Sequence, residues 1–484
     1  MVELLIVIPL LTTIILLITP NTSANLINKV ALFGSLLELW VFLVVTFLYS
    51  KYFQFEYFHI TSWSHVFSGF SKWGDFIFVL DGISLIFIGL SILLLPLCIL
   101  ITWSTVEYLK KEYLVCLYAV LILLIAVFSI VDLLGFYILF EGILIPMFLI
   151  IGIWGSREEK VKAAYYFFFY TLVGSFLMLL AIFKMYSIIG TTNYQSLINI
   201  ELPVSLQCFL FFGFFSSLAV KIPMFPFHIW LPQAHVEAPI SGSVLLAGIL
   251  LKLGGYGFIR FSYPLFPLAA EFFSSFILVL SIIGIIFASI ITCRQTDIKR
   301  LIAYSSVSHM GLVTLALFIH SVYGIIASVI IMVSHGLISS GLFISSVMLY
   351  DRFHTRSMKY YKGLTITMPI LSIITFLLIL SSVAFPSTLN FIGELFAILV
   401  AFNYSYLVGL LLSIGLLFGL VYSLGLYNKI FFGSLVGFVI NSRDLNHNEF
   451  ITFTPILFFT ILFGLLPNSL INYMLKSCFV LVSL

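Results

Sequence analysis

The sequence predicts an all-α polytopic membrane protein that crosses the bilayer about fourteen times. Hydrophobic residues make up 62% of the 484 positions and charged residues only 8%, whereas a soluble domain carries about 25% charged residues. The mean hydropathy is +1.22. Apolar runs of about 20 residues, the length that spans the hydrocarbon core, recur along the whole chain. These observations exclude a soluble globular protein, and the net charge of +3 gives no indication of nucleic-acid binding.

Short polar segments separate the apolar runs, and each run is one candidate span. The runs cover residues 2–20, 27–49, 77–105, 113–131, 133–154, 163–190, 205–230, 242–262, 271–293, 298–319, 322–350, 367–400, 405–432 and 452–475. The boundary between the fourth and fifth runs is the weakest, because Asp132 alone interrupts the apolar residues there. The first run has no basic segment before it and no small-residue cleavage site, so we expect a membrane helix and not a signal peptide.

Lysine and arginine residues gather in alternate loops, which supports this number of spans. Odd-numbered loops hold Lys29, Lys110, Lys111, Arg157, Lys160, Lys162, Arg294, Lys299, Arg300, Arg352, Arg356, Lys359, Lys362, Lys429 and Arg443. Even-numbered loops hold Lys51 and Lys72. Because positively charged loops stay on the inner side of the membrane, we expect both termini on the outer side.

Two spans contain prolines in their interior, Pro223 and Pro226 in the seventh and Pro386 in the twelfth. Proline removes a backbone donor and clashes with the preceding turn, so both helices should be broken. The two breaks lie five spans apart, and an odd offset inverts the second copy relative to the first. The sequence therefore predicts two inverted repeats of five helices, as in secondary transporters. The alternative is that the prolines only kink packed helices.

These features divide the chain into four expected segments. Residues 1–112 contain three N-terminal spans, and residues 113–262 form the first repeat, with the broken helix 7. Residues 271–432 form the second repeat, with the broken helix 12, and residues 433–484 contain a loop and the last span.

Four ionisable residues inside predicted spans are singled out as the strongest indication of function: Glu141, Lys221, Lys252 and Glu394. A charge at the membrane centre costs about 2.5–3.5 kcal/mol on insertion scales, so such residues indicate function. Glu141 and Lys221 belong to the same expected repeat. Burial disfavours the charged forms of both side chains, whereas a short distance between the two favours them. A pair whose separation can vary would therefore act as a proton switch. The alternative for Glu141 is a neutral carboxyl held by one hydrogen bond.

Lys252, His309 and His335, which precede Glu394 in the chain, are candidates for a proton relay. A desolvated ammonium releases its proton more easily than one in water, and histidine exchanges protons near neutral pH. Serines beside both histidines, as in Ser305–Gly311, can hold water. The alternatives are a Lys252 side chain that reaches an interface, and histidines that only pack.

Other charged residues are assigned simpler roles. For His228, His235 and Glu237, near the end of the broken seventh span, we favour structure or gating over proton relay. We expect the charge runs 157–160 and 352–356 on solvated loop faces, with subunit contacts as the alternative. The five cysteines (Cys98, Cys116, Cys208, Cys293 and Cys478) do not have the spacing of a zinc or iron–sulfur site, so we expect buried thiols. The abundance of Phe suits an AT-rich mitochondrial genome.

The motifs around these residues resemble the antiporter-like, proton-translocating family of respiratory complex I and multi-subunit sodium/proton antiporters. The most specific segment runs from Lys221 to Pro239, and Tyr304–Gly311 and Ser334–Gly336 also resemble the family. The resemblance covers spans four to thirteen. Most members carry Lys on the broken twelfth helix, whereas one branch carries Glu, as Glu394 does here.

This resemblance implies a proton-translocating membrane-arm subunit that is driven by redox chemistry elsewhere. The implied path consists of Glu141, Lys221, Lys252, His309, His335 and Glu394. NADH, FMN, iron–sulfur clusters and ubiquinone would bind to other subunits, with no cofactor in this chain. The implied neighbours are paralogous antiporter-like subunits, other membrane-arm subunits and lipid. The implied location is the mitochondrial inner membrane, with both termini on the intermembrane-space side. Two alternatives remain: a subunit of a sodium/proton antiporter, or a structural spacer.

Overall fold

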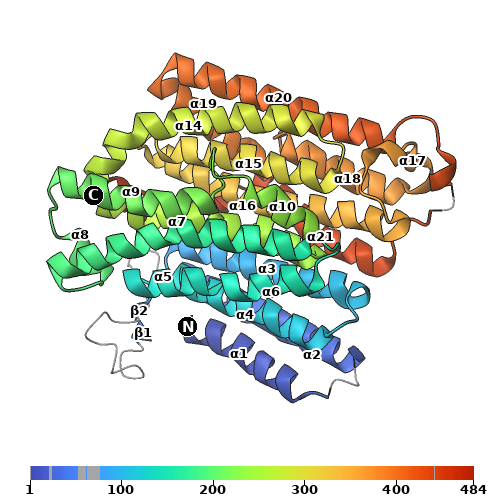
Figure 1. Ribbon diagram of the computed structural model, residues 1–484, viewed down its shortest axis with the longest axis horizontal. Helices are drawn as coiled ribbons and strands as arrows, with labels where there is room; N and C mark the ends of the chain where they lie inside the picture. Colours follow the sequence, from blue (N-terminus) through green and yellow to red (C-terminus); the bar gives the residue numbers. More distant parts are fainter. Residues whose placement is uncertain (1, 21–23, 53–60, 63–76, 441, 484) are drawn as a thin grey trace. The chain divides into compact units, whose positions relative to one another are not determined.

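A computed structural model describes residues 2–20, 24–52, 61–62, 77–440 and 442–483. Lys72, one of the basic residues used above to predict orientation, lies outside this range. The described residues are helical almost throughout (Figure 1). Two short antiparallel strands, β1 (Thr61–Ser62) and β2 (Ile77–Phe78), form the one sheet among them. The prediction of an all-α protein is confirmed.

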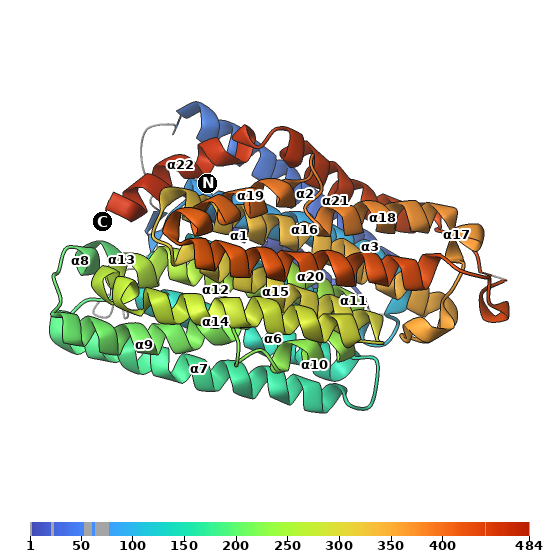
Figure 2. The same ribbon diagram turned by 90° about the horizontal axis from the view of Figure 1, so that it is seen from above.

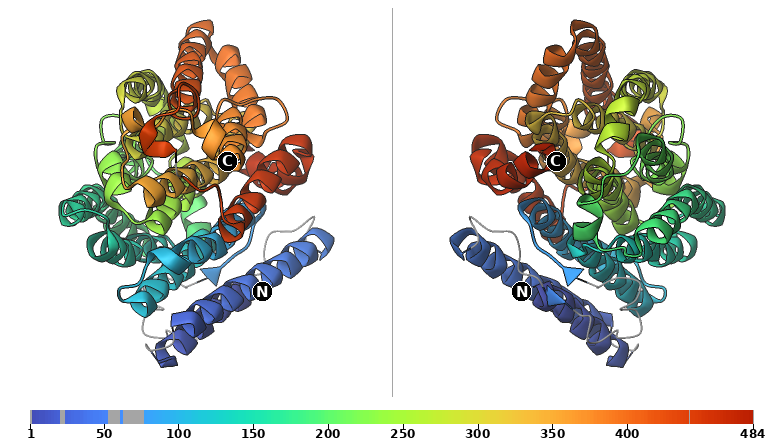
Figure 3. Two further views of the ribbon diagram at one scale, coloured as in Figure 1. Left: turned by 90° about the vertical axis from the view of Figure 1, so that its right-hand side faces the viewer. Right: turned by 90° about the vertical axis from the view of Figure 1, so that its left-hand side faces the viewer.

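The helices fall into two compact units, Met1–Val220 with Tyr256–Ala270, and Lys221–Gly255 with Glu271–Ser483. The elements mainly in the first unit are α1 (Val2–Ile18), α2 (Ala24–Tyr52), α3 (Gly82–Thr105), α4 (Lys110–Ser129), α5 (Leu133–Gly142), α6 (Leu144–Trp154), α7 (Lys160–Ile189), α8 (Tyr194–Ile198), α9 (Val204–Lys221), the π-helix η2 (Phe258–Ser262) and α13 (Tyr263–Leu265). Within this unit, α1 and α2 lie side by side (Figure 3).

The elements mainly in the second unit are α10 (Trp230–Glu237), α11 (Ile240–Leu245), the π-helix η1 (Leu246–Leu250), α12 (Leu251–Gly257), α14 (Pro267–Arg294), α15 (Ile298–Leu317), α16 (Val322–Phe353), the 3₁₀-helix η3 (Met358–Tyr360), α17 (Leu364–Thr367), α18 (Pro369–Ser382), α19 (Leu389–Tyr404), α20 (Tyr406–Phe431), the 3₁₀-helix η4 (Gly437–Val439), α21 (His447–Leu465) and α22 (Asn468–Ser483). Helices α15, α16 and α20 extend along one direction (Figure 2), and α15 packs against both of the others.

Eleven helices among the described residues are long and apolar enough to cross a membrane, and three shorter apolar helices accompany them: α1, α18 and α19. The multi-pass prediction is therefore confirmed. The predicted span 298–319 corresponds to α15, which is more polar than the eleven. Helix α16 is buried along its central part, so its polar side chains face protein. The exact number of spans and the inverted repeats stay predictions.

Short polar side chains begin several of these helices by accepting hydrogen bonds from otherwise unpaired backbone amides. Asp81 and Ser84 form a reciprocal capping box at the start of α3. Asp132 accepts from the amide of Gly135 at 2.8 Å and from the hydroxyl of Thr192 at 2.6 Å. The boundary at Asp132 between the fourth and fifth spans is thus a genuine helix start, as predicted.

Both predicted helix interruptions are present. Helix α9 ends at Lys221 and α10 begins at Trp230, so the prolines between them interrupt the seventh span. Helix α18 ends at Ser382 and α19 begins at Leu389. In this second break Ala384 and Ser387 have positive φ angles of 61° and 83°, which are strained for residues with a side chain.

Helix boundaries depart from the prediction in three places. The fifth span is interrupted at Ile143, because Pro146 cannot donate to the preceding turn. The eighth span contains the π-helices η1 and η2. The predicted last span 452–475 is wrong in its bounds: α21 ends at Leu465 and α22 starts at Asn468. Pro467 lies between them, and a proline disfavours helical geometry at the residue that precedes it.

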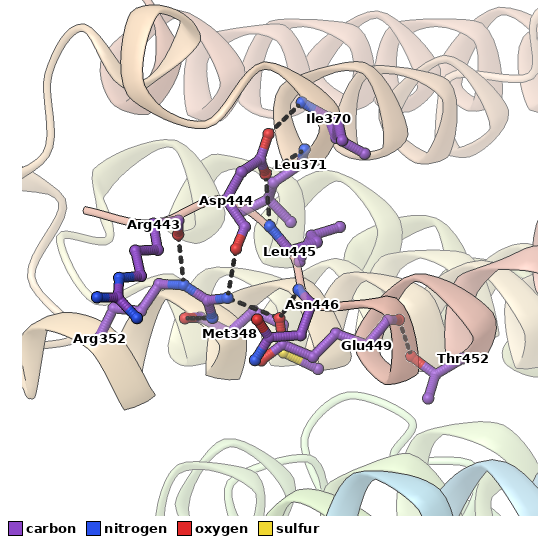
Figure 4. A network of polar contacts seen from close by, with 10 residues as sticks. All are labelled: Met348, Arg352, Ile370, Leu371, Arg443, Asp444, Leu445, Asn446, Glu449 and Thr452. Carbon is purple, nitrogen blue, oxygen red and sulfur yellow. Dashed lines mark hydrogen bonds and ion pairs between the residues drawn. The ribbon is translucent and has the colours of Figure 1, made fainter.

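A polar network in the second unit joins the end of α16 to the starts of α18 and α21 (Figure 4). Arg352 pairs with Glu449 at 2.6 Å and donates to the carbonyls of Arg443 and Asp444. The carboxylate of Asp444 accepts from the amide of Ile370 at 2.8 Å. Asp444 thereby satisfies the first turn of α18, the helix that leads into the second break.

Candidate functional site

Lys252 and His335 form the centre of the candidate site. Lys252 lies on α12 directly after the π-helix η1, and its side chain is fully buried. Its Nζ lies 2.8 Å from Nδ1 of His335 on α16 and also donates to the carbonyl of Ala247 in η1. A π-helical turn disturbs the regular backbone pairing, and here one of its carbonyls accepts from the lysine. The structure therefore joins two of the predicted relay residues directly.

His309 and Glu394 continue the site from His335. The rings of His309 on α15 and His335 have centroids 5.6 Å apart. Nδ1 of His309 lies 3.7 Å from Oε1 of Glu394 on α19. Glu394 is 7% exposed. Lys252 from the first expected repeat and His309, His335 and Glu394 from the second thus lie in one continuous group inside the second unit.

Asn390 holds the Glu394 carboxyl in place. Its amide Nδ2 donates to Oε1 of Glu394 at 2.7 Å, and its Oδ1 accepts from the hydroxyl of Ser334 at 2.9 Å. Sequence analysis did not identify Asn390, and it considered Ser334 only as one of the serines beside His335. Asn390 precedes Glu394 by one helical turn inside an apolar run, a signal that could have found it.

A small cavity of about 20 Å³ lies between the two histidines. Its lining consists of Ser305, His309, His335, Ile338, Ser339, Leu342, Ser382 and Asn390. About 10–15 Å³ is enough for one water when polar partners surround it. The cavity therefore has the size and the lining for a water that connects the two imidazole rings.

The other two predicted site residues, Glu141 and Lys221, lie in different units. Glu141 is near the end of α5 in the first unit, one turn after Tyr137. Lys221 is the last residue of α9, at the start of the first break, and is 4% exposed. Each therefore sits beside a helix interruption. Their pairing as a proton switch stays a prediction.

Two further buried polar groups in the first unit were missed by the sequence analysis. Glu38 lies inside the second predicted span and is fully buried on α2. Asp81 forms an ion pair of 2.9 Å with Arg260, and Arg260 lies over the ring of Tyr194. Glu38 had the same signal as Glu141, an acid inside an apolar run.

The expected solvated position of the 352–356 charge run is wrong for Arg356. Its side chain is 3% exposed and lies 3.8 Å from Oε1 of Glu237. The cause is backbone pairing between the 355–358 loop and the start of α15: the amide of Ile298 donates to the carbonyl of Arg356 at 3.1 Å. That pairing draws the arginine inward, and its guanidinium also covers the ring of Tyr350.

Among the residues the structure describes, no group of three or more His, Cys, Asp and Glu side chains is placed to hold a metal ion. The expectation of buried cysteines is correct for Cys98 and Cys478 but wrong for Cys116, Cys208 and Cys293, which are half-buried. The chemistry that the arrangement offers is proton exchange between lysine, histidine and carboxyl groups along a buried line.

The chain is similar to proteins of a known membrane-protein family. A family model described as NADH:quinone oxidoreductase/Mrp antiporter, TM, matches residues 131–420. The chain is 52% identical to NADH-ubiquinone oxidoreductase chain 4 of Metridium senile over 94% of this chain and 92% of that protein. It is 47% identical to the protein of the same name from Chondrus crispus, over 96% and 94%.

Two solved structures share the fold. A chain of respiratory complex I from Thermus thermophilus with bound NADH matches with a TM-score of 0.89 and 26% identity, over 100% of this chain and 99% of that chain. A chain of the Mrp complex from a Dietzia species matches with a TM-score of 0.86 over 99% and 97%, at 16% identity. The second likeness concerns the fold alone.

Proposed function

The chain belongs to the family of transmembrane subunits shared by NADH:quinone oxidoreductases and Mrp antiporters, and we propose that it is a chain-4 subunit of an NADH:ubiquinone oxidoreductase that moves protons across the membrane. The observation that carries the proton path is the buried line Lys252, His335, His309 and Glu394. Its members come from four different helices, α12, α16, α15 and α19.

Each group on this line can exchange a proton with the next. Lys252 shares a 2.8 Å hydrogen bond with His335, so a proton can pass directly between Nζ and Nδ1. A water in the 20 Å³ cavity can connect His335 with His309. Nδ1 of His309 is 3.7 Å from Glu394, and a small movement would bring the two within hydrogen-bonding distance.

The driving energy comes from redox chemistry on other subunits of the complex, where NADH, FMN, iron–sulfur clusters and ubiquinone bind. This chain's neighbours are other membrane-arm subunits, including paralogous antiporter-like ones. Relatives of the same name come from eukaryotes such as Metridium senile and Chondrus crispus, which supports a place in the mitochondrial inner membrane.

We place both termini on the intermembrane-space side and the 351–362 loop on the matrix side. The support is the gathering of basic residues in alternate loops. Single cysteines introduced at the exposed residues His354 and Tyr360 should react with a membrane-impermeant thiol reagent only when the matrix face is open. If the reagent labels these cysteines in intact mitochondria, the loop faces the intermembrane space and the predicted orientation is wrong.

Glu141→Gln and Lys221→Met should each lower proton pumping while the complex still assembles. Neutralising one member of a switch pair removes its acid–base group, so we expect a loss of about tenfold or more. The measurement is the number of protons moved per NADH oxidised in proteoliposomes. If assembled variants pump at the normal ratio, this chain is a spacer. If pumping stops in sodium-free medium, the antiporter alternative holds.

A further inference from the structure

The carboxyl of Glu394 uses only one of its two oxygens for its contacts with Asn390 and His309. Oε1 accepts from Nδ2 of Asn390 at 2.7 Å and lies 3.7 Å from Nδ1 of His309. Oε2 has no hydrogen-bond or ion-pair partner among the residues that the structure describes. Buried polar atoms are normally hydrogen-bonded, and Glu394 is only 7% exposed. The charged form of this side chain therefore needs a further donor.

Tyr422 supplies a buried hydroxyl near this carboxyl. It lies on α20, is 6% exposed, and its phenol is within electrostatic range of Glu394. Helix α20 packs against α19, which carries Glu394, and against α15, which carries His309. All three helices belong to the second unit. The proton path has so far given this hydroxyl no role.

The hydroxyl of Tyr422 makes only a weak hydrogen bond. Its Oη lies 3.4 Å from Oγ of Ser308, the residue before His309 on α15. Oγ of Ser308 donates its one proton to the carbonyl of Ser305 at 2.8 Å, so Tyr422 is the donor in this contact. Two hydroxyls usually lie about 2.7–2.8 Å apart. The phenolic proton can therefore leave Ser308 for a stronger acceptor.

Close helix packing fixes the position of Tyr422 beside α15. Ile285 of α14 fills the space next to Gly311 of α15 and Gly415 of α20. A Cβ at Gly311 would lie 2.9 Å from Cγ1 of Ile285, and a Cβ at Gly415 would overlap its Cγ2. Gly311 is about one turn from Ser308, and Gly415 is about two turns from Tyr422. The two glycines thus let three helices meet at one level and hold the phenol near the path.

We propose that Tyr422 is a positioning residue of the proton path and alternates between two acceptors, Oγ of Ser308 and Oε2 of Glu394. While the carboxyl holds its proton, the phenol donates to Ser308. When Glu394 releases that proton, the phenol turns to Oε2, because a hydrogen bond to a charged oxygen is about twice as strong as one to a neutral oxygen. The phenol keeps its own proton throughout. The proposal rests on the proton path of the proposed function and adds the donor that stabilises its carboxylate between two transfers.

A purely structural role for the hydroxyl predicts a different pattern. A hydroxyl that only ties α20 to α15 acts through Ser308, so Tyr422→Phe and Ser308→Ala should then have equal effects. A hydroxyl that acts on the Glu394 carboxylate matters only while residue 394 can be charged. Its removal should therefore cause little further loss once Glu394 is replaced by glutamine, because the two changes interrupt one interaction.

The test measures protons per NADH in proteoliposomes that contain the assembled complex, with assembly checked on native gels. Tyr422→Phe keeps the ring and should lower pumping about tenfold, the effect of losing one hydrogen bond to a charged group. Ser308→Ala leaves the phenolic donor in place and should cause a much smaller loss. The double variant Tyr422→Phe with Glu394→Gln should pump within about twofold of Glu394→Gln alone.

Tyr427→Phe is the matched control, because Tyr427 lies on the same helix and undergoes the same exchange. It is 8% exposed, and its Oη donates to the carbonyl of Ser372 at the same distance of 3.4 Å. The control therefore removes an equally long hydrogen bond from a buried tyrosine of α20. It should pump like the unmodified enzyme.

Normal pumping in Tyr422→Phe, with Glu394→Gln impaired, overturns the role of Tyr422 and leaves the proposed function standing. A large further loss in the double variant, or an equal loss in Ser308→Ala, shows a structural hydrogen bond and also overturns that role. Normal pumping in both Glu394→Gln and Lys252→Met overturns the proposed function as well. If Tyr422→Phe does not assemble, Ser308→Ala decides: failure to assemble there too marks the bond as structural, whereas assembly with near-normal pumping supports the proposal.

Discussion

Lys252→Met should lower proton translocation by roughly 10²-fold, the effect of losing one positioned acid–base group. Methionine keeps the apolar stem but removes the Nζ that contacts His335 and the carbonyl of Ala247. Leaving those two groups without a donor costs about 1–3 kcal/mol each, so assembly should weaken without being lost. Protons per NADH in proteoliposomes, normalised to assembled complex, is the measurement.

Lys184→Met is the matched control, because Lys184 is exposed on α7 and the exchange of residues is the same. It should leave pumping unchanged. Lys252→Arg separates charge from proton exchange: a guanidinium keeps the positive charge but does not release its proton, so pumping should stay blocked. Full pumping in Lys252→Arg would mean that Lys252 supplies only a fixed charge.

Glu394→Gln should suppress both NADH turnover and pumping, by about tenfold or more. Glutamine keeps an oxygen to accept from Nδ2 of Asn390, so the 2.7 Å hydrogen bond and the local fold persist. What is lost is an exchangeable proton 3.7 Å from His309. Glu394→Asp keeps that proton on a shorter side chain and should recover part of the activity. Unaltered turnover and pumping in Glu394→Gln would remove this residue from the path.

Glu394→Lys distinguishes proton exchange from the sign of the charge. Most members of the family carry Lys on this helix, so a lysine is compatible with the fold. In this chain, however, Asn390 presents its amide donor to residue 394, while its oxygen is engaged by Ser334. An ammonium would face that donor, so we expect Glu394→Lys to be at least as harmful as Glu394→Gln. Recovery by the double variant Glu394→Lys with Asn390→Asp would show that a lysine at position 394 needs a carboxylate beside it.

Much of the fold was readable from local features of the sequence. An apolar run of about 20 residues forms a spanning helix wherever it occurs, since every backbone group must be paired within the membrane. Pro223 and Pro386 therefore marked real helix breaks, and Asp132 marked a real helix start. The same local reasoning identified Lys252 and Glu394, because a charge inside an apolar run is costly whatever its partners are.

What the sequence could not decide is which of these groups meet. Lys252 and His335 are 83 residues apart in the chain, and nothing local to either residue selects the other. Asn390 was overlooked because its role depends on Ser334, 56 residues away. Arg356 was expected in solvent, and backbone pairing with the start of α15 buries it. Secondary structure and membrane insertion follow from local hydrophobicity and backbone chemistry, whereas a proton path requires contacts between distant helices, and only tertiary packing sets those distances.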